Sequence, residues 1–252
     1  MLKRRKNNAS PFCAHFGLSS FSLRWKLKIL LQFPSYMAAS SRKSLGLVDV
    51  DAAARTRVLH QARAHFFAHG YSHCTMDELA AELGMSKKTL YVHFAGKEEL
   101  IGAVIDDLGS EIRRDADLLL QNRSLNFAEK LRGFVEGMVE RLSALHPRTL
   151  RDLQRHAPAL YAKLDEMRRK NIPYVFGRLI EEGQAAGFVH THLSSDFAIE
   201  FFLQGVQGTL QSPALDRLQL APRDVVPRAI DLFFSGLLTT AGRKQYEKLF
   251  PR

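Results

Sequence analysis

The feature that most constrains the fold is a pair of short helices, each with its own start signal, joined by a glycine turn. Thr75 and Glu78 have the spacing of a capping box, in which the threonine hydroxyl and the glutamate carboxylate each bind a backbone N–H at the beginning of a helix. Gly84 is the residue type that ends a helix in a left-handed turn. We therefore expect a helix from Met76 to Leu83.

The second of these helices carries basic and hydroxyl side chains on the face that its core residues leave free. Ser86 is an N-cap for a helix over Lys87–Phe94, and Leu90 and Phe94, four residues apart, fix its buried side. Lysines in a first turn are unfavourable to the helix macrodipole, and nothing intramolecular obviously rewards the two lysines here. A DNA phosphate or a guanine edge would stabilise them, since recognition helices enter the major groove by their N-terminal residues. The pattern favours a DNA-binding helix-turn-helix.

A longer helix precedes this pair, expected over about Asp51–His69 with Asp51 as its N-cap and Gly70 as its stop. Four histidines in this region raise the question of a metal site: His60, His65, His69 and His73. No carboxylate or cysteine completes a ligand set in the sequence, so we interpret them as polar or half-buried side chains and expect no metal.

A family resemblance covers the region from Arg55 to Leu100. It is carried by the run Thr-Met-Asp-Glu-Leu-Ala-x-x-Leu-Gly-Met-Ser-Lys-x-Thr-Leu-Tyr-x-His-Phe-x-x-Lys-Glu-x-Leu that begins at Thr75. This run resembles the DNA-binding domain of the TetR/AcrR family of transcriptional regulators. The resemblance implies a homodimer with a three-helix DNA-binding domain, followed by a helical domain that binds a small effector. It also implies a palindromic operator on double-stranded DNA, from which the effector releases the protein.

Carried over by position, the resemblance assigns two kinds of DNA contact. Phosphate contacts are implied for Thr75, Ser86, Tyr91, His93 and Lys97. Approaches to the bases are implied for Lys87, Lys88 and Thr89.

The expected fold class is all-α, with a helix-turn-helix domain followed by a helical-bundle domain for ligand binding and dimerisation. The expected domains are a disordered basic extension over residues 1–45, the DNA-binding domain over 46–98 and the effector-binding and dimerisation domain over 99–252. Apolar periodicity and breaker residues predict helices over 97–121, 127–145, 148–156, 159–186, 195–211 and 223–240.

The last two of these helices are rich in large apolar residues on more than one side, which favours a surface that another copy covers. In the family, the corresponding helices build a four-helix dimer interface. The expected interface residues are Phe197, Phe201, Gly205, Gly208, Ile230, Phe233, Phe234 and Leu237.

A pocket among the middle helices has only candidate residues. Those expected to line it are Phe127, Phe134, Met138, Tyr161, Tyr174, Phe176 and Phe201. They favour a small apolar or aromatic effector, although ordinary core packing is the stronger interpretation of each residue alone.

The net charge of +10 gives little support to DNA binding, because residues 1–36 contain seven Lys and Arg and no acid, which leaves +3 for the rest. The sequence from Met37 resembles the usual start of a DNA-binding domain with a short polar arm. Residues 1–36 are therefore interpreted as an extension from a mis-assigned translation start. A basic amphipathic helix on a membrane surface is the alternative for this segment. The two cysteines form no disulfide framework and favour a reducing, cytoplasmic setting, with Cys74 as a buried apolar residue.

An enzyme is not expected, because the chain lacks a Gly-rich phosphate loop, a His-Glu-x-x-His motif, a nucleophile elbow and a Cys/His metal set. We therefore expect a cytoplasmic regulator without a cofactor and without membrane association. A repressor is favoured, and a transcriptional activator of the same fold is the alternative.

Overall fold

The structure, a computed structural model, describes residues 48–143, 149–210 and 212–249. The expectations for residues 1–45, for a start at Met37 and for the helix ends at residues 145, 148 and 211 lie outside the described residues. All described residues belong to one compact unit. The predicted boundary near residue 98 stays a prediction.

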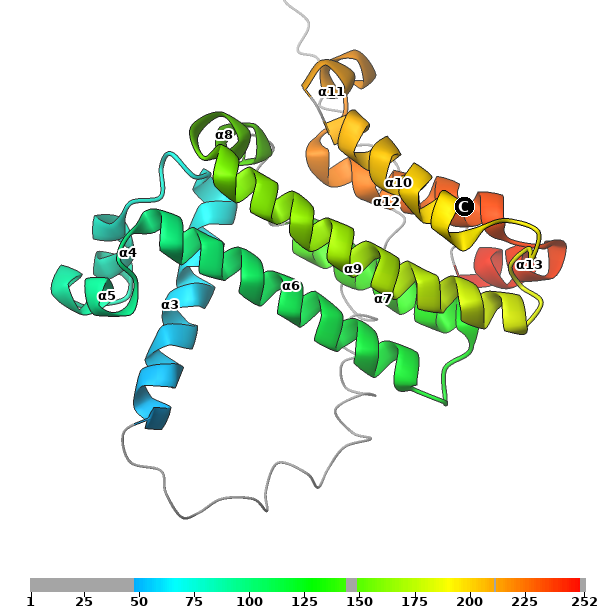
Figure 1. The fold of residues 1–252 in the computed structure, drawn as a ribbon, viewed down its shortest axis with the longest axis horizontal. Helices are drawn as coiled ribbons and strands as arrows, with labels where there is room; N and C mark the ends of the chain where they lie inside the picture. The colour runs from blue at the N-terminus through cyan, green and yellow to red at the C-terminus, as the bar shows by residue number, and fades with distance from the viewer. Residues whose placement is uncertain (1–47, 144–148, 211, 250–252) are drawn as a thin grey trace, which may run out of the picture. The chain divides into compact units, whose positions relative to one another are not determined.

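The described part is all helical, as the sequence predicts. The elements are α3 (Val48–His69), α4 (Met76–Glu82), α5 (Lys87–His93), α6 (Lys97–Gln121), α7 (Phe127–Ser143), α8 (Thr149–His156), α9 (Pro158–Ala185), α10 (Ser195–Leu210), α11 (Ser212–Leu218), α12 (Pro222–Leu237) and α13 (Thr240–Leu249). The two longest, α6 and α9, lie side by side along the molecule, and α3 crosses α6 near its start (Figure 1).

The predicted capping box is present at the start of α4. The Thr75 hydroxyl accepts the backbone N–H of Glu78 at 3.2 Å, and the Glu78 carboxylate accepts the backbone N–H of Thr75 at 3.3 Å. Gly84 follows with φ +63°, the left-handed conformation that glycine adopts without strain. The expected N-cap at Asp51 is wrong, because α3 already begins at Val48 and Asp51 lies inside it.

The helix predicted over residues 223–240 ends earlier, at Leu237, and a separate helix, α13, begins at Thr240. Leu238 has extended backbone geometry and forms an isolated antiparallel bridge with Val189. The backbone N–H of His190 donates to Leu237, and that of Thr239 donates to Phe188. This pairing stops α12 at Leu237. Helices α11 and α13, the latter directly after the bridge, were not predicted from the sequence.

The core beneath the helix-turn-helix extends into the C-terminal helices. Leu79, Leu90 and Phe94 pack in one buried cluster with Leu153 of α8 and Leu160 of α9. The buried core is therefore continuous from the helix-turn-helix through α3 and α6 to α8 and α9. Cys74 is fully buried, as expected, and burial raises the pKa of its thiol to about 11.

Candidate nucleic-acid interface and ligand cavity

Helix α5 is pinned by its inward residues and exposes its N-terminal half. The Ser86 hydroxyl accepts the backbone N–H of Thr89 at 3.0 Å and caps the helix. Leu90 and Phe94 are buried, as the spacing predicts. The opposite face carries Tyr91, 49% exposed, and Val92, 76% exposed. A large apolar residue this exposed on a small capped helix fits contact with a surface outside the protomer.

Lys87 and Lys88 are both exposed at the tip of α5, but only one of them lacks an intramolecular ion pair. The Lys87 ammonium pairs with the Asp77 carboxylate at 2.5 Å, which corrects the expectation that nothing in the chain rewards these lysines. Both side chains are about 60% exposed, so the pair contributes roughly 0–1 kcal/mol and can give way to a phosphate. Among the described residues, Lys88 forms no ion pair.

Three of the predicted phosphate contacts and one predicted base contact have partners within the protein. The Thr75 hydroxyl donates to Glu78 at 2.7 Å, and the Ser86 and Thr89 hydroxyls are 2.8 Å apart. Lys97 is half-buried, where its ammonium donates to the Tyr71 carbonyl at 3.1 Å and lies 4.0 Å from the centre of that ring. Lys97 thus helps to hold the end of the α3–α4 connection.

Arg55 is a basic residue at this face that the sequence analysis did not single out. It is exposed on α3, and its guanidinium donates to the carbonyl of His93 at 2.8 Å while covering the Phe94 ring. Arg55 therefore binds the carbonyl of the last residue of α5 and places a cation beside it. The sequence signal was present, because Arg55 begins the family-like region, but the contact spans 38 residues.

A second link joins the helix-turn-helix to α8. The Asp152 carboxylate accepts the backbone N–H of Ser72 at 2.6 Å and its hydroxyl at 2.5 Å. Burial raises the pKa of Asp152, but the hydrogen bonds from Ser72 and the charge of His156 outweigh burial, so the pKa is lowered overall. Among the described residues, Asp152 is the only charged side chain of α8 that hydrogen-bonds the connection between α3 and α4.

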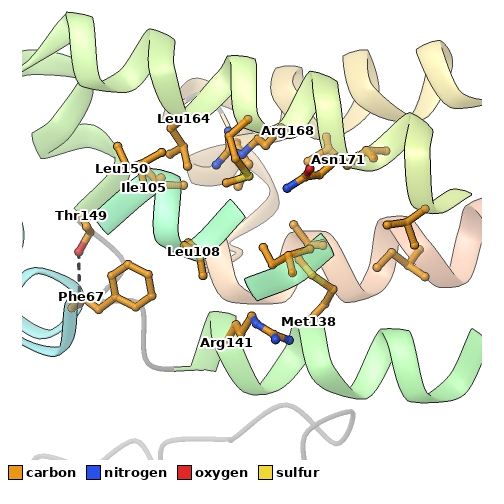
Figure 2. Close-up of a pocket in the computed structure, with 18 of the residues that line it drawn as sticks. Phe67, Ile105, Leu108, Met138, Arg141, Thr149, Leu150, Leu164, Arg168 and Asn171 are labelled. Carbon is orange, nitrogen blue, oxygen red and sulfur yellow. Dashed lines mark hydrogen bonds between the residues drawn. The ribbon is translucent and has the colours of Figure 1, made fainter. Parts of the chain in front are cut away.

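The cavity lies behind this link and has a volume of about 140 Å³. Its wall comes from α3, α6, α7, α8, α9, α10 and α12. Three expected residues line it: Phe134, Met138 and Phe176. Figure 2 shows α9 contributing Leu164, Arg168 and Asn171, while Met138 and Arg141 approach from α7.

The other four expected pocket residues lie elsewhere. Phe127 packs against Phe188 near the far end of α9. Tyr174 donates to Asp117, with the guanidinium groups of Arg113 and Arg178 over its ring. Phe201 is exposed on α10, and Tyr161 is half-buried outside the cavity wall. Aromatic content alone did not indicate which side of each helix faces inward.

Only half of the residues expected at the dimer face are exposed on the protomer. Phe197 (73% exposed), Phe201 (67%), Gly205 and Gly208 form an exposed stripe on α10. Ile230, Phe234 and Leu237 are instead buried in the protomer's own core, and Phe233 stacks on Phe176. Helix α12 turns a different stripe outward: Arg228, Leu232 (75% exposed) and Gly236. The largest side chains of α12 are needed to close the core against α9 and α10.

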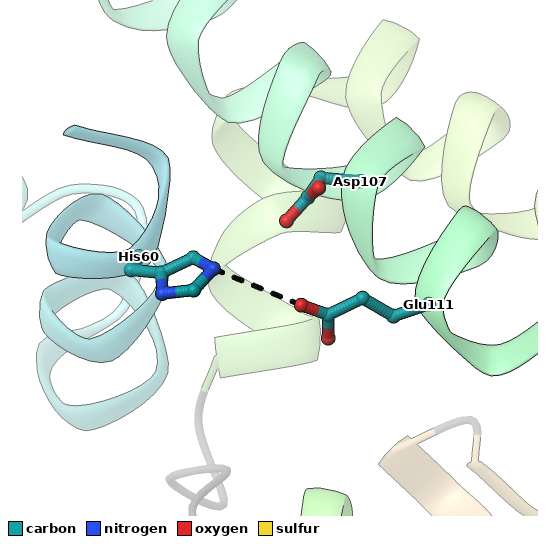
Figure 3. Close-up of side chains that lie close together, drawn as sticks. All are labelled: His60, Asp107 and Glu111. Carbon is teal, nitrogen blue, oxygen red and sulfur yellow. Dashed lines mark ion pairs between the residues drawn. The ribbon is translucent and has the colours of Figure 1, made fainter. Parts of the chain in front are cut away.

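In the structure, carboxylates lie close to two of the histidines of this region, which the sequence did not predict. His65 is buried, with its Nδ1 2.9 Å from the Glu82 carboxylate. His60 on α3 faces Asp107 and Glu111 on α6 (Figure 3), and their ligand atoms lie within 4.8 Å of one another. The Glu111 carboxylate also pairs with Arg63 at 2.6 Å. A metal ion would have to compete with that guanidinium. We therefore interpret these polar side chains as contacts that hold α3 against α6.

No helix among the described residues is long and apolar enough to cross a membrane.

Comparisons with known proteins agree with this geometry. Residues 58–104 match the family model described as bacterial regulatory proteins, tetR family. The chain is 23% identical over 163 residues to the uncharacterized HTH-type transcriptional regulator YvaF of Bacillus subtilis (strain 168), covering 65% of this chain and 85% of the relative. It is 22% identical over 186 residues to the HTH-type transcriptional repressor DhaR of Mycobacterium sp. (strain GP1), covering 73% and 92%. A solved TetR transcription regulatory protein from Mycobacterium vanbaalenii is 25% identical, with a TM-score of 0.54, and covers 77% of this chain and 100% of that one.

Proposed function

The chain is a helix-turn-helix transcriptional regulator of the TetR family and not an enzyme, and from this premise we propose that it is a cytoplasmic repressor released from DNA by a small effector. The proposed complex is a homodimer on a palindromic operator. The observation that carries the proposal is the exposed N-terminal half of α5, held in place by buried Leu90 and Phe94. Repression is favoured over activation by the similarity to DhaR, which its name describes as a repressor.

The proposed DNA contacts follow from what α5 exposes. Lys87, Lys88 and Thr89 are proposed to approach the bases, because the first turn of a recognition helix enters the major groove. Thr75, Ser86, Tyr91, His93 and Lys97 are proposed to bind phosphates. Phosphate contacts set register and orientation, and the few residues in the groove read sequence. Arg55 adds a cation beside this set.

The homodimer is proposed to form through α10 and α12, which pack together within the protomer. A methyl group added at Gly205, Gly208 or Gly236 would meet nothing within 4 Å. The protomer itself therefore does not require these glycines, whereas close approach of a second copy would. A two-fold dimer places two α5 helices in successive major grooves, about 34–36 Å apart.

Selection of bound duplexes from a random library tests this proposal directly. The expected product is an inverted repeat whose half-sites are centred about one helical turn, or a multiple, apart. Recovery of single half-sites only would contradict the dimer, and recovery of no preferred sequence would contradict specific recognition by α5. A reporter gene placed behind the selected operator then separates repression from activation by the sign of its response.

Effector release is proposed to run through α8. Leu150 and Leu153 of α8 line the cavity, and Asp152, between them on the helix, holds Ser72 of the α3–α4 connection. Phe66 and Phe67 at the end of α3 also line the cavity. A ligand in the cavity would therefore press on the two elements that seat the helix-turn-helix. Its effect would be a shift between dimer populations that fit and do not fit the operator.

Replacing Tyr91 with alanine is expected to weaken operator binding by roughly tenfold, because a hydrogen bond to a charged group contributes about 1.5–3 kcal/mol. The loss should be similar on every operator sequence, since a phosphate contact carries no base information. A gel-shift titration measures it. Tyr91→Phe is the matched control, which keeps the ring and should show most of the loss. Full affinity in both variants would remove Tyr91 from the interface.

Replacing Asp152 with asparagine is expected to destabilise the protein at pH 7 by about 1–3 kcal/mol, because Ser72 loses a charged acceptor. The pKa of Asp152 is lowered in the fold, so its contribution is present above the ordinary value of 3.8 and is lost as the pH falls below it. Urea unfolding should therefore separate the variant from the unaltered protein at pH 7 but not at pH values below the lowered pKa.

The control for this comparison is Asp106→Asn, which breaks an exposed pair with Lys163 and should change stability little at any pH. A difference for Asp152→Asn that persists unchanged at low pH would show that the carboxylate charge is not what holds Ser72.

A further inference from the structure

Arg168 places a positive charge in a cavity wall that is mostly apolar. The wall is otherwise almost entirely hydrocarbon, with aliphatic side chains from α6, α8 and α9 and aromatic rings from α3, α7, α9 and α10. Arg168 lies on α9 between Leu164 and Asn171, and its guanidinium is drawn among the residues that surround the cavity (Figure 2). Arg168 is half-buried, and a guanidinium held against an apolar wall favours an anionic partner.

The one carboxylate that acts on Arg168 is shared with another guanidinium. Tyr161 and Asp165 both favour the charged form of Arg168, but the Asp165 carboxylate is paired with Arg169 at 3.0 Å. Among the described residues, no carboxylate forms an ion pair with Arg168. Burial lowers the pKa of the Arg168 guanidinium, and the opposing effects of Tyr161 and Asp165 do not restore it.

The other polar groups of the wall are already satisfied. Arg141 pairs with Asp115 and donates to the carbonyl of Gly137 at 3.0 Å. The Asn171 amide donates to the Gly109 carbonyl at 2.9 Å, and its oxygen accepts from Arg113. The Thr149 hydroxyl donates to the Phe67 carbonyl at 3.4 Å. Arg168 is therefore the one cationic group of the described wall whose charge is not matched by the chain.

A guanidinium remains charged under all ordinary conditions and presents a planar fork of donors that fits a carboxylate. Charge-assisted bonds of this kind are about twice as strong as neutral ones. A ligand carboxylate would thus supply what Tyr161 does not. A neutral apolar ligand would leave the Arg168 guanidinium without an anionic partner.

The cavity volume limits what else the ligand carries. At about 140 Å³ the cavity is close to the roughly 150 Å³ of an engineered apolar cavity in another protein that binds benzene. Rings of Phe67, Phe134, Phe176 and Phe202 stand in the wall, and aromatic pairs favour edge-to-face and offset contacts with a further ring. The space and the wall together suit one six-membered ring.

We propose that the cavity binds a small monocarboxylate with a single aromatic ring, with its carboxylate on the Arg168 guanidinium and its ring among Phe134 and Phe176. This proposal names the chemical class of the effector and to that extent rests on the proposed function. It narrows the sequence-based expectation, which gave only an apolar or aromatic molecule.

Calorimetric titration of the full chain with matched ligands tests the proposal without DNA. Benzoate and phenylacetate are the anionic probes, and benzamide and phenylacetamide are their neutral isosteres. One of the carboxylates is expected to bind at least about tenfold more tightly than its amide, the ratio that about 1.4 kcal/mol of ion pairing gives. In Arg168→Met this ratio should fall to near one, while the amide still binds. Arg168→Lys should keep part of the preference.

Two results would overturn the proposal: equal binding of acid and amide by the unaltered protein, or a preference that survives in Arg168→Met. Absence of binding by all four probes would also overturn it. If Arg168→Met does not fold, the comparison of acid with amide on the unaltered protein decides alone.

A gel shift of the operator complex with the same probes separates this proposal from the proposed function. Binding without release of DNA would leave the Arg168 site intact and reject its role in regulation. Release of DNA by an unrelated molecule, with no binding of the carboxylates, would reject the Arg168 site and leave the proposed regulation by an effector intact.

Discussion

Phe201→Asp is expected to convert the proposed dimer to a monomer and to lower affinity for the proposed operator by more than about 100-fold, equivalent to about 2.8 kcal/mol. Phe201 lies at the middle of the exposed stripe of α10, one turn from both Phe197 and Gly205. An aspartate there would lose its hydration on dimerisation with no cation in the α10 stripe to receive it. Two-fold symmetry introduces the charge twice, so the two penalties and their mutual repulsion add.

The operator effect follows from geometry, because a monomer offers α5 to only one half-site and loses the gain of a second, linked contact. Sedimentation measures the oligomeric state, and a gel-shift titration measures affinity on the full operator and on a single half-site. The loss should be large on the full operator and small on the half-site. Leu118→Asp is the matched control, an apolar-to-acid change at an exposed position of α6. A Phe201→Asp protein that remains dimeric would place the interface elsewhere.

The helix-turn-helix could be predicted closely because its signals are local. The bonds of Thr75 with Glu78 and of Ser86 with Thr89 span three residues each, and the sequence spacing alone fixes them. The burial of Leu90 and Phe94 follows from the same short register. The Lys87–Asp77 pair was missed because it crosses the turn and joins two helices whose mutual orientation is tertiary.

Side-chain roles in the C-terminal helices were predicted less well, for a physical reason. Helix α12 has large apolar residues on more than one side, and both a core and an interface select such residues. Only the packing of α9 and α10 decides that Phe234 goes inward and Leu232 outward. The cavity wall likewise joins seven helices, so no single periodicity contains it. Arg168 was overlooked because an arginine in a helix usually faces solvent.

Phe176→Ala is expected to destabilise the protein by about 3–5 kcal/mol, the usual cost of removing a buried phenylalanine. Phe176 is almost fully buried on α9, and its ring contacts those of Phe134, Phe202, Phe233 and Phe234, with centroid distances of 5.6, 4.9, 5.4 and 5.2 Å. It thereby joins α7, α10 and α12 to α9. A loss of this size is a large part of the roughly 5–15 kcal/mol that a domain has. Thermal unfolding should shift downward by roughly 10 °C.

The same ring is part of the wall of the ligand cavity, so its removal should enlarge the cavity as well as weaken the core. A ligand that fills the new space binds the folded state alone and raises the unfolding temperature by mass action. The unaltered cavity also has room for one ring, so benzene is expected to recover part of the lost stability and to raise the unfolding temperature of Phe176→Ala more than that of the unaltered protein. Leu118→Ala, at an exposed position of α6, should lose little stability and gain nothing from benzene. If Phe176→Ala unfolds at the unaltered temperature, the ring cluster does not hold α9 to α10 and α12. A ligand would then have no packed element through which to move them.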